Sequence, residues 1–97
     1  MMYYAVASDQ DLKTDITRVH TMENGLNLYA FRYKGDERGF VGVLAEELAA
    51  DPRFASAVTQ GEGGYLLVNY GKLGLPLMEG EQMAAAGQAA LARALAQ

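Results

Sequence analysis

The segment 26–33 constrains the fold more than any other, because apolar side chains fill both faces of an extended chain there. Aliphatic residues occupy one face and aromatic residues the other: Leu26, Leu28 and Ala30 against Tyr29, Phe31 and Tyr33. This pattern is typical of a β-strand that is covered on both sides. The aromatic face could stack sugars or bases, but alternating aromatics in a strand more often pack in a core, and we predict packing here.

Three further elements are expected after this strand: a returning strand over 40–44, a helical turn or two over 45–50, and a last strand over 65–70. The polar residues 34–39 permit a hairpin between the first two strands. The helical turns end at Asp51-Pro52, because the residue before a proline avoids the helical region. We predict that the three strands form one antiparallel sheet.

A short helix is predicted ahead of these strands, over 9–21. Leu12, Ile16 and Val19 stand at positions i, i+4 and i+7 and would form one apolar stripe. The pair Asn24-Gly25 then ends the helix. We expect the sheet to pack against this stripe.

The C-terminal part, 71–97, predicts a second helix, since eight of its last fifteen residues are alanine, the best helix former. Four positions spaced by four residues leave a narrow stripe of small side chains: Met83, Gly87, Leu91 and Leu95. A helix of this length is barely stable alone in water, so it needs a partner. Two partners stay open, namely the chain's own sheet or two further copies of the helix around a threefold axis.

These elements predict an α+β fold, with a small antiparallel sheet packed on a short N-terminal helix, plus a C-terminal alanine-rich helix. The 97 residues are expected to form a single domain. Residues 1–7 are expected to be an upstream strand or linker end, and residues 71–97 the C-terminal helical part. A chain of this size buries only about two-thirds of its unfolded surface, which favours association with other copies.

Composition argues against several classes of function. A net charge of −4, with the basic residues scattered singly, gives no electrostatic footprint for nucleic acid or an anionic membrane. The absence of cysteine excludes a thiolate metal site and a cysteine nucleophile. The single histidine, His20, cannot build a metal cluster alone. We therefore expect no metal, no other cofactor, no nucleic-acid partner and no membrane partner.

A serine five residues before a lysine, Ser8 and Lys13, indicates a nucleophile with its own base. The lysine can take the serine proton only if burial or a cationic neighbour drives it toward the neutral amine. Five positions along one helix would set the two side chains roughly 140° apart. Ser8 must therefore stand outside the helix, or the lysine must come from a neighbouring chain. The carboxylates nearby oppose a neutral amine: Asp9, Asp11 and Asp15.

The alternative interpretation of this segment is structural. Ser8 or Asp9 would cap a short helix, with Asp11 completing a loose capping box. Lys13 would then be a solvated charge. Single Ser/Lys spacings recur by accident, so the rest of the chain has to decide between the two interpretations.

Four motifs follow one another along the chain: Ser-Asp-x-x-Leu-Lys at 8–13, Leu-x-x-Tyr-x-Phe-x-Tyr-Lys at 26–34, Val-Gly-Val-x-Ala-x-Glu at 41–47 and Val-x-Tyr-x-x-Leu at 68–73. In this order they resemble the intramolecular chaperone auto-processing domain at the C-terminus of phage tailspikes and tail fibres, the endosialidase type. Related domains occur in bacterial tail-fibre-domain proteins. The resemblance extends from Ser8 to about Met78. The family usually has glutamine where Glu46 stands, so Glu47 is the better match.

The resemblance implies that the domain aligns three fibre chains as a homotrimer and then cuts itself between Ala7 and Ser8. It makes Ser8 the nucleophile and Lys13 the base. The implied partners are the other copies and the upstream fibre segment. The implied setting is the host bacterial cytoplasm during assembly, followed by the virion tail fibre or a prophage-derived protein.

The alternative is a non-catalytic trimerisation or interaction module of a tail-fibre-like protein, which keeps the fold without cleavage. Because only seven residues precede Ser8, we expect either a fragment of a longer fibre protein or a stand-alone relative.

Overall fold

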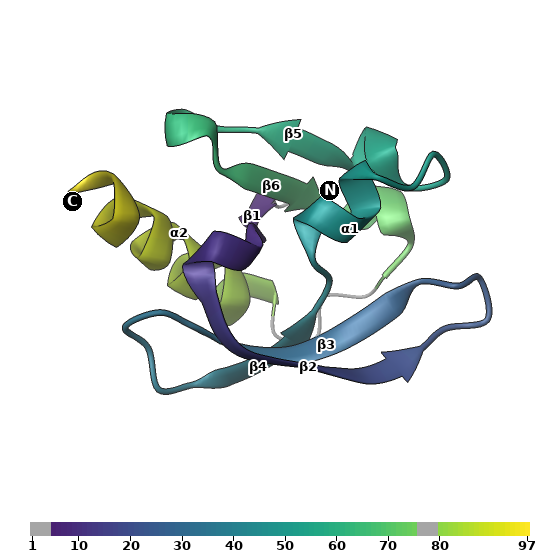
Figure 1. The fold of residues 1–97 in the computed structure, drawn as a ribbon, viewed down its shortest axis with the longest axis horizontal. Coiled ribbons are helices and arrows are strands. Elements are labelled where there is room, and N and C mark those ends of the chain that lie inside the picture. The colour runs from purple at the N-terminus through teal and green to yellow at the C-terminus, as the bar shows by residue number, and fades with distance from the viewer. Residues whose placement is uncertain (1–4, 76–79) are drawn as a thin grey trace.

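The computed structural model describes residues 5–75 and 80–97, and within them the chain forms two antiparallel three-stranded sheets and two α-helices (Figure 1). One sheet has the order β1-β6-β5 and the other the order β2-β3-β4. The strands are β1 (Ala5–Ala7), β2 (Lys13–Thr21), β3 (Asn27–Tyr33), β4 (Gly39–Gly42), β5 (Val58–Gln60) and β6 (Leu66–Asn69). The helices are α1 (Ala45–Ala49) and α2 (Gly80–Leu95), with 3-10 turns η1 (Gln10–Leu12), η2 (Ala55–Ala57), η3 (Glu62–Gly64) and η4 (Tyr70–Leu73). The predicted α+β fold is confirmed.

The core lies between the two sheets and against one side of α2 (Figure 1). Phe31 and Tyr33 of β3 are buried in it, and their rings meet edge to face with centroids 5.1 Å apart. Phe31 also pairs in register with Phe40 of β4. The predicted hairpin of the strands over 26–33 and 40–44 and the packing role of the buried aromatics are therefore confirmed. The opposite face of β3 is only partly covered, because Leu28 and Ala30 are half-buried and Arg32 is exposed.

The predicted N-terminal helix over 9–21 is wrong. A single 3-10 turn, η1, follows Asp9, and the chain then enters β2. β2 is rich in β-branched side chains, which favour a strand over a helix. Its pairing with β3 shifts between Thr14 and Thr17, and Asp15 has a φ of 55°. This irregularity breaks the period of two that would have revealed a strand, and Ile16 and Val19 of the supposed apolar stripe are exposed.

The predicted single sheet is also wrong in one strand. The last strand, β6, does not pair with β3 or β4; it lies between β1 and β5, with Val68 opposite both Val6 and Val58. β1 and β5 have only three residues each, too few to show a period of two in the sequence. The β1-β6-β5 sheet holds β1, and with it Ala7, against the core.

Helix α2 forms as predicted and packs against its own chain beside β1. Met83, Gly87 and Leu91 of the predicted stripe are buried, whereas Leu95 is exposed. These contacts are those of the first alternative, packing on the chain's own sheet, whereas association with further copies of the helix stays a prediction. In the part of the chain that the structure describes, none of the helices has the length and apolar character needed to cross a membrane.

Candidate active site

The fold brings Ser8 and Lys13 into contact, with 2.7 Å between Lys13 Nζ and Ser8 Oγ. Ser8 follows the last residue of β1, and Lys13 is the first residue of β2, so Asp9 and η1 form the whole connection between them. The Asp9 carboxylate caps this turn by accepting a hydrogen bond from the amide of Asp11 at 2.9 Å. Ser8 thus stands outside any helix, and the lysine comes from the same chain.

Ser8 is fully buried and is held by segments that lie far apart in the sequence. Its hydroxyl donates to the carbonyl of Val43 at 2.6 Å. Its amide donates to the carbonyl of Leu66 on β6 at 3.1 Å, and its own carbonyl accepts from the amide of Ala45 at 3.1 Å. The β6 strand, the segment after β4 and the start of α1 therefore fix the position of this one residue.

Lys13 is buried as well, with 3% of its surface exposed, so it is not the solvated charge of the structural interpretation. Its ammonium donates to the carbonyls of Val43 at 2.8 Å and Ser8 at 3.1 Å, and it lies 4.2 Å from the centroid of the Phe31 ring. Burial lowers the pKa of Lys13 to about 7, against the opposing effect of Glu46 and Asp9. A substantial fraction of the neutral amine is thus available near neutral pH.

The sequence had indicated that three aspartates would keep Lys13 charged, and the structure corrects this. Asp15 pairs with Arg32 on the exposed part of the β2–β3 ladder, and Asp11 is exposed. Of the three, Asp9 raises the pKa of Lys13, and burial outweighs it. Sequence spacing places these charges near the lysine but does not show how dry its surroundings are.

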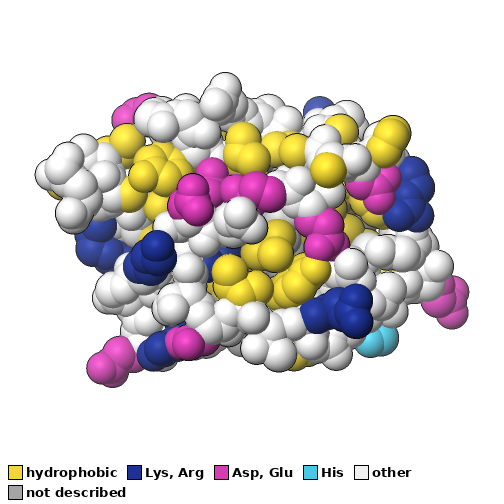
Figure 2. Space-filling view, in the orientation of Figure 1, with side chains coloured by type: hydrophobic (Ala, Val, Ile, Leu, Met, Phe, Trp, Pro, Cys, Tyr) yellow, Lys and Arg dark blue, Asp and Glu magenta, His cyan; other side chains and the backbone are white. Residues whose placement is uncertain are grey.

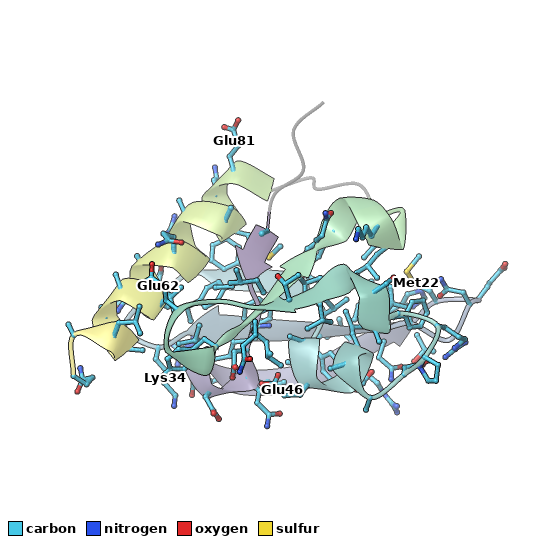
Figure 3. All side chains as sticks on the ribbon, turned by 90° about the horizontal axis from the view of Figure 1, so that it is seen from above. Met22, Lys34, Glu46, Glu62 and Glu81 are labelled. Carbon is cyan, nitrogen blue, oxygen red and sulfur yellow. The ribbon has the colours of Figure 1, made fainter. Side chains whose placement is uncertain are left out.

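Glu46 rather than Glu47 lies at this site. Glu46 Oε1 accepts from the amide of Gln10 at 2.9 Å, so the carboxyl lies beside η1 (Figure 3). Acidic side chains gather near the middle of the face drawn in Figure 2. Burial, together with the neighbouring Asp9 carboxyl, raises the pKa of Glu46. Glu47 instead accepts hydrogen bonds from Tyr29 and, at 2.8 Å, from the side chain of Asn27.

The Val-Gly-Val motif has two roles here that its sequence did not reveal. The carbonyl of Val43 accepts hydrogen bonds from both Ser8 and Lys13, and its amide donates to the hydroxyl of Tyr70 at 3.0 Å. Gly42 leaves room for that hydroxyl, because a Cβ at this position would lie 2.4 Å from it. Tyr70 is buried, and this burial raises the pKa of its hydroxyl.

Tyr33, which the sequence assigned to packing, has a polar contact as well. Its hydroxyl donates to the carbonyl of Ala7 at 2.6 Å, directly beside Ser8. The signal available in the sequence was indirect: a buried tyrosine needs a partner for its hydroxyl, but the sequence does not say which one. In the described residues, every buried side-chain nitrogen and oxygen has a hydrogen-bond partner.

The contacts provide a serine hydroxyl and, within hydrogen-bond reach, an amine whose pKa is suited to accept its proton near neutral pH. The carbonyl carbon of Ala7 is the nearest electrophile along the chain, because it is bonded to the nitrogen of Ser8. Residues for a metal are not gathered here: in the described ranges, no three His, Asp or Glu side chains come together as ligands would.

Residues 8–59, which include the Ser8 and Lys13 pair, match a known family. The sequence model of the family described as chaperone of endosialidase matches residues 8–59, a match that begins at Ser8 itself and includes Lys13, Tyr33 and Val43. No curated protein and no solved structure matches the chain significantly. The family match covers more than half of the sequence, and the chain therefore belongs to the chaperone of endosialidase family.

Proposed function

We propose that this chain is the C-terminal intramolecular chaperone of a trimeric, phage tail-fibre-like protein, and that it cuts its own backbone between Ala7 and Ser8 after folding. The observation that carries the cleavage is the contact of 2.7 Å between Lys13 Nζ and Ser8 Oγ, both buried. Membership of the chaperone of endosialidase family supports the chaperone role.

The reaction begins when the Ser8 hydroxyl turns from Val43 O toward Lys13 Nζ and gives its proton to the neutral amine. Ser8 Oγ then attacks the carbonyl carbon of Ala7, and a tetrahedral intermediate forms with its negative charge on Ala7 O. The bond between the Ala7 carbon and the Ser8 nitrogen breaks, while Lys13 returns the proton to that nitrogen. The hydrogen bond from the Ser8 amide to Leu66 O holds this leaving nitrogen in place.

The product of these steps is an ester between Ala7 and Ser8 Oγ, with a free amino group on Ser8. One water molecule then hydrolyses the ester and leaves a carboxylate on Ala7 and the original hydroxyl on Ser8. Lys13 has gained and lost one proton, so it is regenerated. The overall reaction consumes one water and breaks one peptide bond.

Cleavage is coupled to folding by the way in which the site is built. Ser8 and Lys13 begin and end a turn between the two sheets, and the carbonyls that hold them come from beyond β4 and from β6. The lowered pKa of Lys13 depends on burial and is absent from an unfolded chain. The cut would therefore follow folding, and removal of the chaperone would leave the upstream fibre kinetically trapped in its assembled form.

The partners in this proposal are two further copies of the chain and the upstream fibre segment. Apolar side chains remain exposed on the β2–β3–β4 sheet and offer surface for such contacts: Ile16, Val19 and Val41. The proposed setting is the host bacterial cytoplasm during assembly and the virion tail fibre, or a prophage-derived protein, afterwards.

The test is a fusion of a folded fibre segment ahead of Met1, followed by intact-mass measurement. We expect a product cut between Ala7 and Ser8, no cut in Ser8→Ala, and none in Lys13→Arg, because arginine keeps the charge but cannot accept a proton. Lys34→Arg is the matched control, since Lys34 is an exposed lysine outside the site, and it should be cut at the parent rate.

Two outcomes separate the candidate functions. If Lys13→Arg is processed as fast as the parent, Lys13 is not the base. If the parent fusion stays whole although it is folded and trimeric, the non-catalytic trimerisation module is the correct function.

A further inference from the structure

We propose that Tyr33 is a catalytic residue of the self-cleavage, whose hydroxyl stabilises the negative charge that develops on Ala7 O. This inference rests on the proposed function, since it concerns the peptide bond that the Ser8 and Lys13 pair would break. It assigns a role to a residue that the sequence predicts to be part of the packed core.

The contact is between Tyr33 and the reacting carbonyl itself. Tyr33 Oη donates to Ala7 O at 2.6 Å, and Ala7 O belongs to the peptide bond between Ala7 and Ser8. The donor comes from β3 in one sheet and the acceptor from β1 in the other. Attack by Ser8 Oγ turns this carbonyl oxygen into an oxyanion, so the hydrogen bond strengthens as the reaction proceeds.

The tyrosine is held rigidly and away from water, as a preorganised donor requires. Its side chain has 0% exposure, and its ring packs against those of Phe31 and Phe40, with centroids 5.1 and 6.0 Å away. Burial raises the pKa of Tyr33 well above its usual range, with a smaller effect from Tyr70. The hydroxyl therefore keeps its proton and acts as a hydrogen-bond donor, while the proton of Ser8 goes to Lys13.

Helix α2 completes this contact from the other side. A Cβ at Gly87 would lie 2.9 Å from Tyr33 Oη and 3.1 Å from Ala7 O, so the helix backbone passes directly over both atoms. Glycine is a poorer helix former than alanine, and here it provides the space that the hydrogen bond needs. The C-terminal helix lies beyond the family match, which ends at residue 59, yet it closes the reaction site.

The experiment compares Tyr33→Phe with Tyr29→Phe in the fibre fusion. Both variants remove one hydroxyl from the same strand, but the Tyr29 hydroxyl donates to Glu47, away from Ala7. After refolding from denaturant, intact mass follows the fraction cut over time at several pH values. We expect Tyr33→Phe to slow the first-order cleavage by roughly 10²- to 10³-fold, as for other lost oxyanion donors, and Tyr29→Phe to stay within about twofold of the parent.

The pH profile separates oxyanion stabilisation from an indirect effect on the base. If Tyr33 acts on the oxyanion, the midpoint of the rate profile stays at the parent value and the plateau falls. A shifted midpoint with an unchanged plateau would overturn the proposal, since Tyr33 would then act through Lys13. An uncut parent fusion rejects the proposed function itself, whereas a cut parent with an equally fast Tyr33→Phe rejects only the role of Tyr33.

A second variant decides the matter if Tyr33→Phe does not fold. Gly87→Ala keeps the tyrosine but crowds Tyr33 Oη and Ala7 O, so we expect slow cleavage in a chain whose α2 helix is intact by circular dichroism. Gly39→Ala is its control, because a Cβ there has no atom within 4 Å. Cleavage of Gly87→Ala at the rate of Gly39→Ala would overturn the proposal.

Discussion

The beginning of the β2 strand places neighbouring charged groups in opposite surroundings. At its start, Lys13 is buried beside the Asp9 and Glu46 carboxyls, and its pKa is lowered to about 7. Two residues later, Asp15 pairs with Arg32 in the open, with 59% and 45% of their side chains exposed. Water screens the Asp15–Arg32 pair, so this pair contributes little to stability. Lys13, by contrast, can stay charged only at the cost of losing its hydration. Burial, rather than the number of opposite charges nearby, decides what a charged group can do in this fold.

The largest effect expected from this contrast is on stability, measured in the Ser8→Ala chain so that cleavage does not interfere. Lys13 has a lower pKa in the folded state than in the unfolded state, so the unfolded chain binds more protons between about pH 7 and its ordinary value of 10.5. The free energy of unfolding should therefore rise with pH in this window, by about 3 kcal/mol from pH 6 to pH 9.

The comparison chain carries Ser8→Ala with Lys13→Met. Methionine leaves no titrating group at this position. Of the two carbonyls that Lys13 contacts, the backbone carbonyl of residue 8 still accepts a hydrogen bond from the amide of Ala45. Urea unfolding at each pH should give a nearly flat profile for this chain. The same rise in both chains would mean that Lys13 is protonated in the folded state throughout this range.

The next effect is on the cleavage rate, because only neutral Lys13 can accept the serine proton. The rate should increase about tenfold per pH unit below a midpoint near 7 and then level off. Between pH 5 and pH 8 the expected difference is about 100-fold, measured by intact mass of the refolded fusion. A rate that is flat over this range would remove Lys13 as the base.

A smaller effect should follow from Glu46→Gln, which removes the charge that most raises the pKa of Lys13. The rate midpoint should move to lower pH, by less than one unit, and the rate at pH 6 should increase a few-fold. Glu47→Gln is the control, because Glu47 contacts Tyr29 and Asn27 instead, and it should leave the midpoint unchanged. A midpoint that moves upward in Glu46→Gln would contradict the electrostatic account.

The sequence was sufficient for elements whose pattern is long and regular. The β3 strand with its buried aromatics and the alanine-rich α2 helix follow from periods of two and of about four. β2 was misread because Asp15 and the register shifts beside it interrupt the alternation, and β1 and β5 are too short to show one. Pattern reading therefore fails where the backbone is irregular or the element is short.

The candidate site was only half visible for a related reason. The spacing of Ser8 and Lys13 is local, so the sequence could pair them, but the partners that give the pair its chemistry are distant. Val43 O lies 30 residues from Lys13, and Tyr33 lies 26 residues from Ala7. The protonation of Lys13 depends on burial by both sheets, which no local motif records.

The smallest effect is expected two residues after Lys13, where Asp15→Asn removes the exposed pair with Arg32. Both side chains are largely exposed, so the free energy of unfolding should change by no more than about 0.5 kcal/mol, and less as salt is added. The cleavage rate and its midpoint should stay at the parent values, since the charge that acts on Lys13 comes from Glu46 and Asp9 rather than Asp15. Urea unfolding at low and high salt, with the rate profile of the same fusion, measures both quantities. A midpoint that moves as far in Asp15→Asn as in Glu46→Gln would show that exposed charges on β2 reach the site, and the contrast between the buried lysine and the exposed ion pair would then be lost.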